Sequence, residues 1–311
     1  MRAYLFPGQG AQAVGMGRAL AEAYPAARDV FDAVDEALGE RLSAVIWDGP
    51  ADDLTLTANA QPALMATSLA AVRALEAEGV SIADAGFVAG HSLGEYSALA
   101  AAGALEVGTA ARLLRLRGAA MQEAVPVGVG AMAAILGLDA EAVRALAEEA
   151  AGSEVCEAAN DNDPGQVVVS GHKAAVERAC EIAKARGAKR AMMLPVSAPF
   201  HCRLMQPAAE AMAEALADAE IKPPVVPVVA NVRAEAVSAP EDLRRLLVEQ
   251  VTAPVRWRES VLWMAANGVT ETVELGAGKA LSGMVRRIEK TLVVANVSAP
   301  EDLGKLKELG A

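Results

Sequence analysis

The stretch 87–96 constrains this chain more than any other. An apolar run suited to a β-strand ends in Gly90-His-Ser-Leu-Gly94, and an alanine-rich helical run follows. Strand, Gly-x-Ser-x-Gly and helix, in that order, form the context of a nucleophile elbow, a strained turn that exposes a serine hydroxyl at the edge of a sheet. A Cβ at either glycine would crowd the neighbouring elements. The order favours Ser92 as a nucleophile, with the backbone N–H of Leu93 facing the oxyanion. The alternative is a turn with a capping serine.

Composition narrows the class of protein. The chain has 311 residues, of which 53% are hydrophobic and 22% charged, so it can bury a sizeable core, and disorder is not expected. Its net charge of −12 argues against nucleic acid as a general partner. No apolar run approaches the ~20 residues of a membrane span, and the start lacks the pattern of a signal peptide. We therefore expect a cytoplasmic protein that does not enter a membrane.

The cysteines fit that location. Cys156, Cys180 and Cys202 are odd in number and show no Cys-x-x-Cys spacing. We interpret them as free thiols in a reducing compartment, because neither a disulfide framework nor a zinc site has this arrangement.

A glycine-rich loop follows the first apolar strand, at 3–6. Gly8, Gly10 and Ala13 fit the start of a dinucleotide fingerprint. That fingerprint requires a second strand ending in an acid about twenty residues later, whereas 26–38 has the periodicity of a helix. We therefore expect this loop to bring a backbone N–H, that of Gln9, close to a neighbouring site.

Two other stretches resemble ligand loops without completing them. Gly276-Ala-Gly-Lys279 lacks the upstream glycine of a phosphate loop, and Ala280 replaces its hydroxyl residue. It predicts a strand-to-helix turn. Asn160-Asp-Asn-Asp-Pro-Gly165 lacks the glutamate of a calcium loop and predicts a hairpin turn.

Two polar residues lie where helices are expected. The stretch 57–62 is predicted to open a helix that runs to Glu78, and Pro62 suits its first turn. Gln61 is interpreted as a polar cap, with a site residue as the alternative. Arg117 lies in a predicted helix at 106–124 and would by default be solvated. The alternative is that Arg117 turns towards Ser92 and binds a carboxylate through its planar fork.

The middle of the chain changes pattern. Its elements are predicted at 130–138 (strand), 140–150 (helix), 155–160 (strand), 166–170 (strand), 173–186 (helix) and 190–195 (strand). This β-α-β-β-α-β order is the ferredoxin-like signature. We expect an α/β fold with a hydrolase-like parallel-sheet core built from 1–126 and 196–311, and an inserted ferredoxin-like α+β subdomain at 127–195.

Elimination selects a base for the serine. His91 adjoins Ser92 in an extended segment, so its side chain points away from the hydroxyl. His172 falls in the inserted subdomain. His201 remains, approached by a rigid segment with prolines at 195 and 199. The alternative is a surface histidine at the start of the next helix.

Motifs along almost the whole chain resemble those of the acyltransferase family of fatty acid and polyketide synthesis, in its malonyl-CoA:acyl carrier protein transacylase branch. They are Phe6-Pro-Gly-Gln-Gly-Ala-Gln12, Gln61-Pro-Ala-Leu64, Gly90-His-Ser-Leu-Gly-Glu-Tyr-Ser-Ala-Leu99, Arg117-Gly118, Met121-Gln-Glu-Ala-Val-Pro126, Pro199-Phe-His-Cys202, 250–257 and Leu275-Gly-Ala-Gly-Lys279. Their joint occurrence in this order is specific, and the inserted ferredoxin-like subdomain falls where the family has one.

The resemblance implies a role for each matching residue. Ser92 is the nucleophile and His201 its base, the N–H groups of Gln9 and Leu93 form the oxyanion hole, and Arg117 binds the malonyl carboxylate. A backbone carbonyl in the segment of Gln250 orients the histidine in place of a triad acid. Phe200 matches the malonyl-selective motif, since its ring leaves little room for an α-methyl group. Gln61, Met121 and Gln250 are assigned to substrate binding.

The implied reaction is a ping-pong transfer. Malonyl-CoA acylates Ser92, and the pantetheine thiol of acyl carrier protein then takes the malonyl group. No metal or resident cofactor is required. A serine hydrolase using the same elbow is the alternative, and Arg117 and Phe200 argue against it. A non-catalytic carrier-binding subunit is a more distant alternative, which Ser92 and His201 argue against.

The carrier partner raises a question of charge. Acyl carrier proteins are acidic and so is this chain, so docking needs a local basic patch. Two clusters are candidates: Lys184, Arg186, Lys189 and Arg190, and Lys279, Arg286 and Arg287. We select Arg190, Arg286 and Arg287, on the expectation that they lie on opposite sides of one cleft, and interpret Lys184 and Lys279 as solvated. We expect a monomer.

Overall fold

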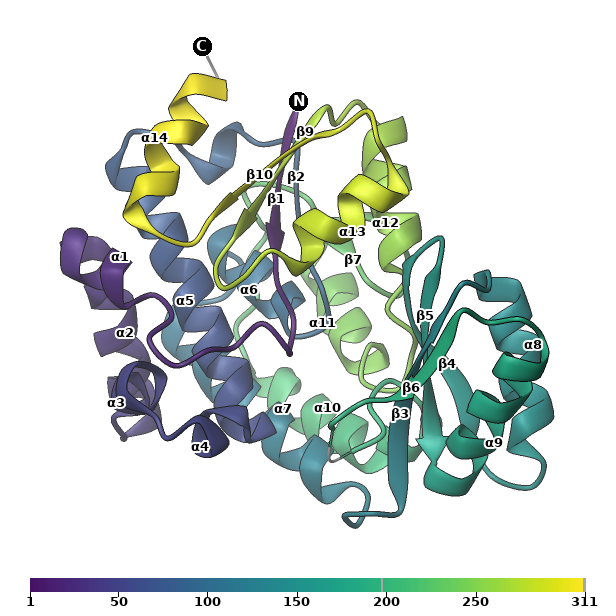
Figure 1. Ribbon diagram of the computed structural model, residues 1–311. Helices are drawn as coiled ribbons and strands as arrows, with labels where there is room; N and C mark the ends of the chain where they lie inside the picture. Colours follow the sequence, from purple (N-terminus) through teal and green to yellow (C-terminus); the bar gives the residue numbers. More distant parts are fainter. Residues whose placement is uncertain (197, 310–311) are drawn as a thin grey trace.

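The computed structural model describes residues 1–196 and 198–309. Its main sheet has the strand order β10-β9-β1-β2-β7-β8 (Figure 1). These strands are β1 (Arg2–Phe6), β2 (Phe87–Gly90), β7 (Val228–Ala230), β8 (Glu235–Val237), β9 (Glu271–Leu275) and β10 (Val293–Val297). All pairs are parallel except β7 with β8. Strand β1 pairs with β2 on one side and with β9 on the other, so the strand order changes direction at β1. At such a switch point the carboxyl ends of the strands border a crevice.

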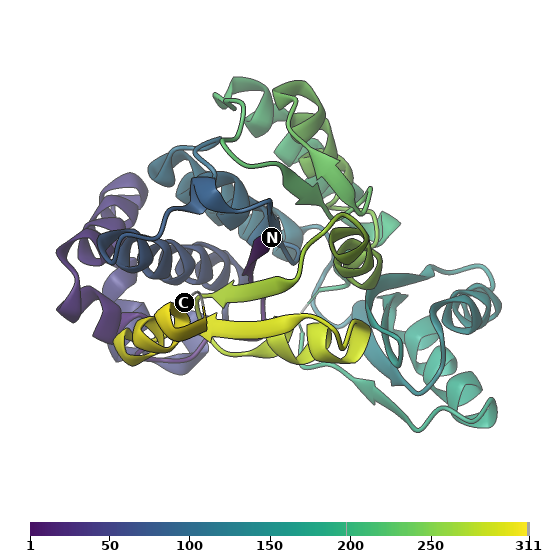
Figure 2. The ribbon, with the colours of Figure 1, turned by 90° about the horizontal axis from the view of Figure 1, so that it is seen from above.

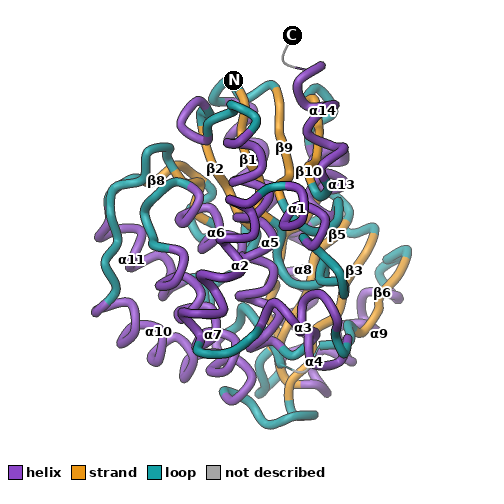
Figure 3. Tube along the Cα trace, turned by 90° about the vertical axis from the view of Figure 1, so that its left-hand side faces the viewer, coloured by secondary structure: helices purple, strands orange, loops and turns teal. Residues whose placement is uncertain are grey.

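Helices cover both faces of this sheet (Figure 3). They are α1 (Arg18–Ala23), α2 (Pro25–Leu38), α3 (Leu42–Asp48), α4 (Ala51–Thr55), α5 (Thr57–Ala77), η1 (Ile82–Asp84), α6 (Gly94–Ala101), α7 (Val107–Glu123), η2 (Arg203–Met205), α10 (Gln206–Asp218), α11 (Pro240–Glu249), α12 (Trp257–Ala266), α13 (Ala280–Ile288) and α14 (Pro300–Leu309). Strand alternation divides the core: Tyr4 and Phe6 join the cluster that includes α2, α5 and α7, whereas Ala3 and Leu5 pack with α12 and α13. Among the described helices, none is long and apolar enough to cross a membrane.

The inserted subdomain is a four-stranded antiparallel sheet in the order β4-β5-β3-β6. Its elements are β3 (Gly130–Leu136), α8 (Ala140–Ala151), β4 (Cys156–Asp163), β5 (Gln166–His172), α9 (Lys173–Ala185) and β6 (Arg190–Met193). The ferredoxin-like prediction is confirmed by this order. The subdomain projects from one side of the molecule in both Figure 1 and Figure 2. One sheet face packs on α8 and α9, while Met132, Ala134 and Val168 on the other face join the core of the large domain.

The prediction of a hairpin turn at 160–165 was wrong for most of its length. Strand β4 continues to Asp163, and only Pro164 and Gly165 separate it from β5. The cause is tertiary pairing. The N–H of Asp161 donates to the oxygen of Val255 at 2.9 Å, and the N–H of Val255 donates to the oxygen of Ala159 at 2.9 Å. A turn-forming composition thus became a buried strand, because the large domain supplies partners for its backbone.

The predicted helix that opens in 57–62 is confirmed, but the placing of Pro62 in its first turn was wrong. Helix α5 begins at Thr57, so Pro62 lies inside it, and Gln61 is buried at 1% exposure rather than capping the end. Helix α7 holds the extra turn in place. A Cβ at Gly118 would lie 2.5 Å from the Thr57 oxygen and 2.7 Å from the Ala58 Cα, so the backbones of the two helices are in close contact.

Candidate active site

The serine turn has the geometry of a strained elbow at the carboxyl end of β2. Ser92 has a φ of 54°, in the left-handed region that costs energy for a residue other than glycine. A Cβ on Gly90 would lie 1.8 Å from the Gly94 oxygen, and one on Gly94 would lie 2.2 Å from the Phe6 oxygen. The predicted need for both glycines is confirmed, because any side chain would push apart β1, β2 and α6.

His201 lies against the serine. Its Nε2 is 2.8 Å from Ser92 Oγ, and its Nδ1 is 2.9 Å from the backbone oxygen of Gln250. A carbonyl can only accept, so Nδ1 carries the proton and Nε2 of the neutral ring is free to accept the serine proton. Burial, and then the charge of Arg117, lower the pKa of His201 to about 3, so the ring is neutral at ordinary pH. His201 is 4% exposed, which excludes the surface interpretation.

Arg117 turns inward from α7, the alternative that its position in the sequence left open. It is 1% exposed, and its Nη1 donates to Gln61 Oε1 at 2.8 Å. Its Nη2 donates to Gln250 Oε1 at 2.7 Å and to Ser92 Oγ at 3.2 Å. Among the described residues, all these acceptors are neutral oxygens, and Nε has no partner. A buried cation without a directly paired anion beside a nucleophile is a place where a ligand carboxylate would be stabilised.

Gln250 connects these groups. Its backbone oxygen accepts from His201, and its side-chain oxygen accepts from Arg117. Its Nε2 donates to the Ser92 oxygen at 3.0 Å and to Glu95 Oε2 at 2.8 Å. Gln250 is fully buried, at 0% exposure. One residue thus contacts the serine, the histidine and the arginine.

The remaining predicted binding residues line the same region. Gln61 Nε2 lies 3.8 Å from the sulfur of Met121, which is 1% exposed. Phe200 precedes His201 and is 8% exposed. The fold therefore brings Gln61 to Arg117 and Met121 to Gln61, while Phe200 adjoins His201 in the chain.

The two predicted oxyanion donors occupy suitable loops. Leu93 is the N-cap residue of α6, and Gln9 follows β1, the strand beside β2. Among residues 1–196 and 198–309, neither backbone N–H has a hydrogen-bond partner. An unpaired N–H at the start of a helix is a donor available to an oxyanion.

Sequence reasoning missed two residues that contact the candidate site, Asn231 and Glu95. Asn231, directly after β7, accepts from the Ser92 N–H at 2.8 Å through Oδ1 and donates to the Gly90 oxygen at 2.6 Å through Nδ2. Its own N–H donates to Glu95 Oε2 at 3.0 Å. Asn231 left no signal, but Glu95 did: a charged side chain in an otherwise apolar helix, directly after the elbow, is buried at a cost unless it has partners.

The residues selected for carrier docking are separated. Arg190 pairs with Leu136, Leu136 with Gln166, and Gln166 with Asp163, so Arg190 and Asp163 end one row across the small sheet. Three strand spacings put them roughly 14 Å apart. Arg287 Nε donates to Asp163 Oδ2 at 2.8 Å, while Arg286 Nη2 donates to the Val294 oxygen at 3.2 Å. Arg287 therefore also joins the two domains.

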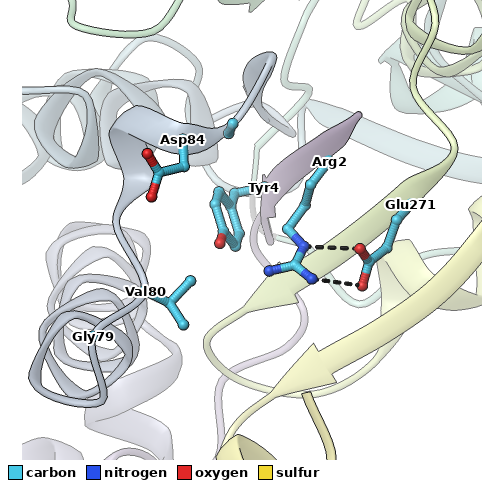
Figure 4. A pocket seen from close by; sticks show the side chains of 7 residues that line it. Arg2, Tyr4, Gly79, Val80, Asp84 and Glu271 are labelled. Carbon is cyan, nitrogen blue, oxygen red and sulfur yellow. Dashed lines mark hydrogen bonds and ion pairs between the residues drawn. The ribbon is translucent and has the colours of Figure 1, made fainter. Parts of the chain in front are cut away.

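A pocket of about 290 Å³ lies away from this site (Figure 4). Arg2 and Tyr4, from the start of β1, line it, whereas the serine lies beyond the other end of that sheet. Arg2 is already bound to Glu271 through two hydrogen bonds of 2.9 and 3.2 Å. The Arg2 guanidinium is thus already paired with a carboxylate. We therefore do not assign the reaction to this pocket.

The fold and this set of side chains are those of a serine-dependent acyl-transfer enzyme. Comparison with known proteins narrows the class. Residues 3–308 match the Acyl transferase domain family, and the chain belongs to that family. It is 49% identical to malonyl CoA-acyl carrier protein transacylase of Bacillus subtilis, over 97% of this chain and 94% of the relative.

Solved structures agree along the whole chain. An acyl-carrier-protein S-malonyltransferase from Bartonella henselae superposes with a TM-score of 0.97 at 53% identity, covering 100% of this chain and 99% of the other. A malonyl-transacylase in complex with its type II polyketide acyl-carrier protein superposes with a TM-score of 0.96 at 44% identity, covering 99% of each chain.

Proposed function

We propose that this chain transfers the malonyl group of malonyl-CoA to the pantetheine thiol of an acyl carrier protein, for fatty acid synthesis. The names of its relatives support that reaction. One observation carries it: among the described residues, buried Arg117 is bound only to neutral oxygens, and its Nη2 lies 3.2 Å from Ser92 Oγ. An acyl group with a terminal carboxylate supplies the missing anion, and bidentate binding to a guanidinium fixes it beside the nucleophile. A general serine hydrolase has no need for such a group.

In the first half-reaction, Ser92 attacks the thioester carbonyl while His201 Nε2 takes its proton. The N–H groups of Leu93 and Gln9 stabilise the oxyanion of the tetrahedral intermediate. The intermediate collapses with cleavage of the carbon–sulfur bond, His201 returns its proton to the departing thiolate of coenzyme A, and a malonyl-serine ester remains.

In the second half-reaction, His201 accepts the proton of the carrier's thiol, whose sulfur attacks the ester carbonyl. The carbon–oxygen bond breaks, the proton passes to Ser92 Oγ, and malonyl-carrier leaves. Because Gln250 holds Nδ1 through a neutral carbonyl, the base works without a carboxylate partner. Arg117 keeps the malonyl carboxylate in place through both steps.

Three finer assignments belong to this proposal. The ring of Phe200, beside the base, limits space at the α-carbon and favours malonyl over methylmalonyl. The catalytic domain comprises 1–126 and 196–311 and the ferredoxin-like subdomain 127–195, and the chain acts as a monomer. The separate core of α8, α9 and their sheet supports that division.

Intact-mass measurement after addition of malonyl-CoA tests the proposal. The protein should gain one malonyl group, peptide mapping should place it on Ser92, and holo-carrier protein should remove it. Ser92→Ala should gain nothing. Label on Cys202, label persisting in Ser92→Ala, or loss of the label to water at the rate seen with carrier would contradict the proposal.

A further inference from the structure

Glu95 is a buried carboxyl group that the proposed reaction does not use. It lies in the first turn of α6, three residues after the serine, and is 1% exposed. Among the described residues, no lysine, arginine or histidine forms an ion pair with it. Burying an unpaired carboxylate costs several kcal/mol unless hydrogen bonds compensate, so its partners indicate why it is there.

Its partners are the residues that hold the site. Glu95 Oε2 accepts from Gln250 Nε2 at 2.8 Å and from the Asn231 N–H at 3.0 Å. Gln250 Nε2 also donates to the Ser92 oxygen, which can only accept. Two acceptors, a carboxylate and a carbonyl, therefore require the NH₂ end of the amide on their side. The amide oxygen is then left facing Arg117, at 2.7 Å from Nη2.

We propose that Glu95 is a positioning residue for malonyl transfer: by fixing the orientation of the Gln250 amide, it holds the Arg117 guanidinium beside Ser92. The inference rests on the proposed function. The Glu95 carboxylate acts on Arg117 through the Gln250 amide between them. It therefore supports the buried positive charge without occupying the guanidinium itself. A carboxylate in direct contact would compete with the malonyl group for the same N–H donors.

The electrostatics of the site agree with this geometry. Burial raises the pKa of Glu95 to about 7, while the Asn231 and Gln250 hydrogen bonds and the charge of Arg117 oppose the rise. The neighbouring groups that titrate or carry charge are Arg117 on α7 and Tyr96 on α6. Since Arg117 stays charged and burial raises the pKa of Tyr96 further, Glu95 is the group of this set that changes charge near neutral pH.

The test compares acylation of Ser92 by malonyl-CoA and by acetyl-CoA, which has no carboxylate to bind. Glu95→Gln keeps the size and an acceptor oxygen but removes the charge and the demand for the NH₂ end. It should lower kcat/KM for malonyl-CoA about tenfold, while changing that for acetyl-CoA less than about threefold. Glu95→Ala should do so more strongly, and Glu95→Asp should not restore selectivity, because its shorter side chain falls short of Gln250. Glu106→Gln, at an exposed position before α7, is the matched control and should change neither.

The pH dependence gives a second measurement on the wild type. Its preference for malonyl over acetyl should fall as pH drops through about 7, and the preference of Glu95→Gln should not depend on pH in that range. Equal losses for both acyl groups in Glu95→Gln would show that Glu95 only supports the elbow and would overturn the inference. If Glu95→Ala does not fold, Glu95→Gln still decides. Wild-type protein that takes up no malonyl group would instead overturn the proposed function.

Discussion

The backbone oxygen of Gln250 lies 2.9 Å from Nδ1 of His201. The side chain of the same residue binds Arg117, so its backbone orients the histidine while its side chain orients the arginine. A neutral carbonyl orients the ring and selects its tautomer, but it does not stabilise a charged imidazolium as a carboxylate would. The histidine is thus held as a neutral base.

His201 should act as a base over a wide pH range. Because burial lowers the pKa of His201 to about 3, protonation of the ring should not abolish acylation until well below neutral pH. The linked stability follows with the same sign: the unfolded chain binds the extra proton below pH 6.5, so stability falls from there down to pH 3, by up to ~5 kcal/mol. Urea unfolding of wild type and His201→Ala across this range measures it.

His201→Ala should also lose ~4 kcal/mol or more of transition-state stabilisation.

Arg117→Ala should change which acyl group is accepted. Loss of the guanidinium should weaken malonyl transfer by roughly 2–5 kcal/mol, the scale for leaving a buried charge unpaired. Acetyl transfer should fall much less or rise. Arg112→Ala, on the same helix at an exposed position, is the control. Equal losses for the two thioesters would mean that Arg117 only supports the fold.

Acids between the serine and the histidine should not belong to a triad. Asp161 accepts from Arg258 at 2.8 Å and Asp163 from Arg287, so both carboxylates join domains rather than serve His201. Asp161→Asn should keep kcat within about tenfold of wild type. It should lower the free energy of unfolding by about 1–3 kcal/mol, because Arg258 loses its charged partner. The loss stays in this range because Arg258 is partly exposed and keeps some water. A loss of activity equal to that of His201→Ala would reveal a conventional triad.

Carrier docking should depend on charge at the small subdomain and α13. Arg190→Glu and Arg286→Glu should lower kcat/KM for the carrier and spare acylation by malonyl-CoA, with a defect that narrows as salt rises, since screening at 0.15 M confines exposed charges to about 8 Å. Arg287→Glu is a poorer probe, because it would place a glutamate against Asp163 at the domain junction. A carrier step insensitive to salt would exclude these residues as the docking site.

The difference in free energy of unfolding between Glu95→Gln and wild type should change with pH. A raised pKa means that the group's contribution is fully present below pH 4.5 and is lost as pH rises through about 7. Relative to wild type, Glu95→Gln should therefore gain about 3 kcal/mol between those limits. Parallel denaturant titrations measure this difference. A constant offset between the two proteins would show that Glu95 keeps an ordinary pKa in the folded state.

Local signals were sufficient for the elbow and for the order of the elements in the inserted subdomain. The glycines at 90 and 94 could be interpreted from the sequence alone, because the contacts that exclude a Cβ involve a strand, a turn and a helix that follow one another, together with the neighbouring β1. The β-α-β-β-α-β order followed from hydrophobic periodicity. Periodicity records which face of each element is buried, and that suffices for a ferredoxin-like sheet.

Only the tertiary structure decided the polar contacts between distant parts of the chain. Asn231 binds Ser92 across 139 positions, and Gln250 binds it across 158. Single polar residues at such separations leave no periodic signal. A glutamine before a proline is therefore indistinguishable from a helix cap, and Asn160-Asp-Asn-Asp163 from a turn. Their burial is set by which groups the folded backbone brings to meet them, because a buried polar group is stable only where those partners exist.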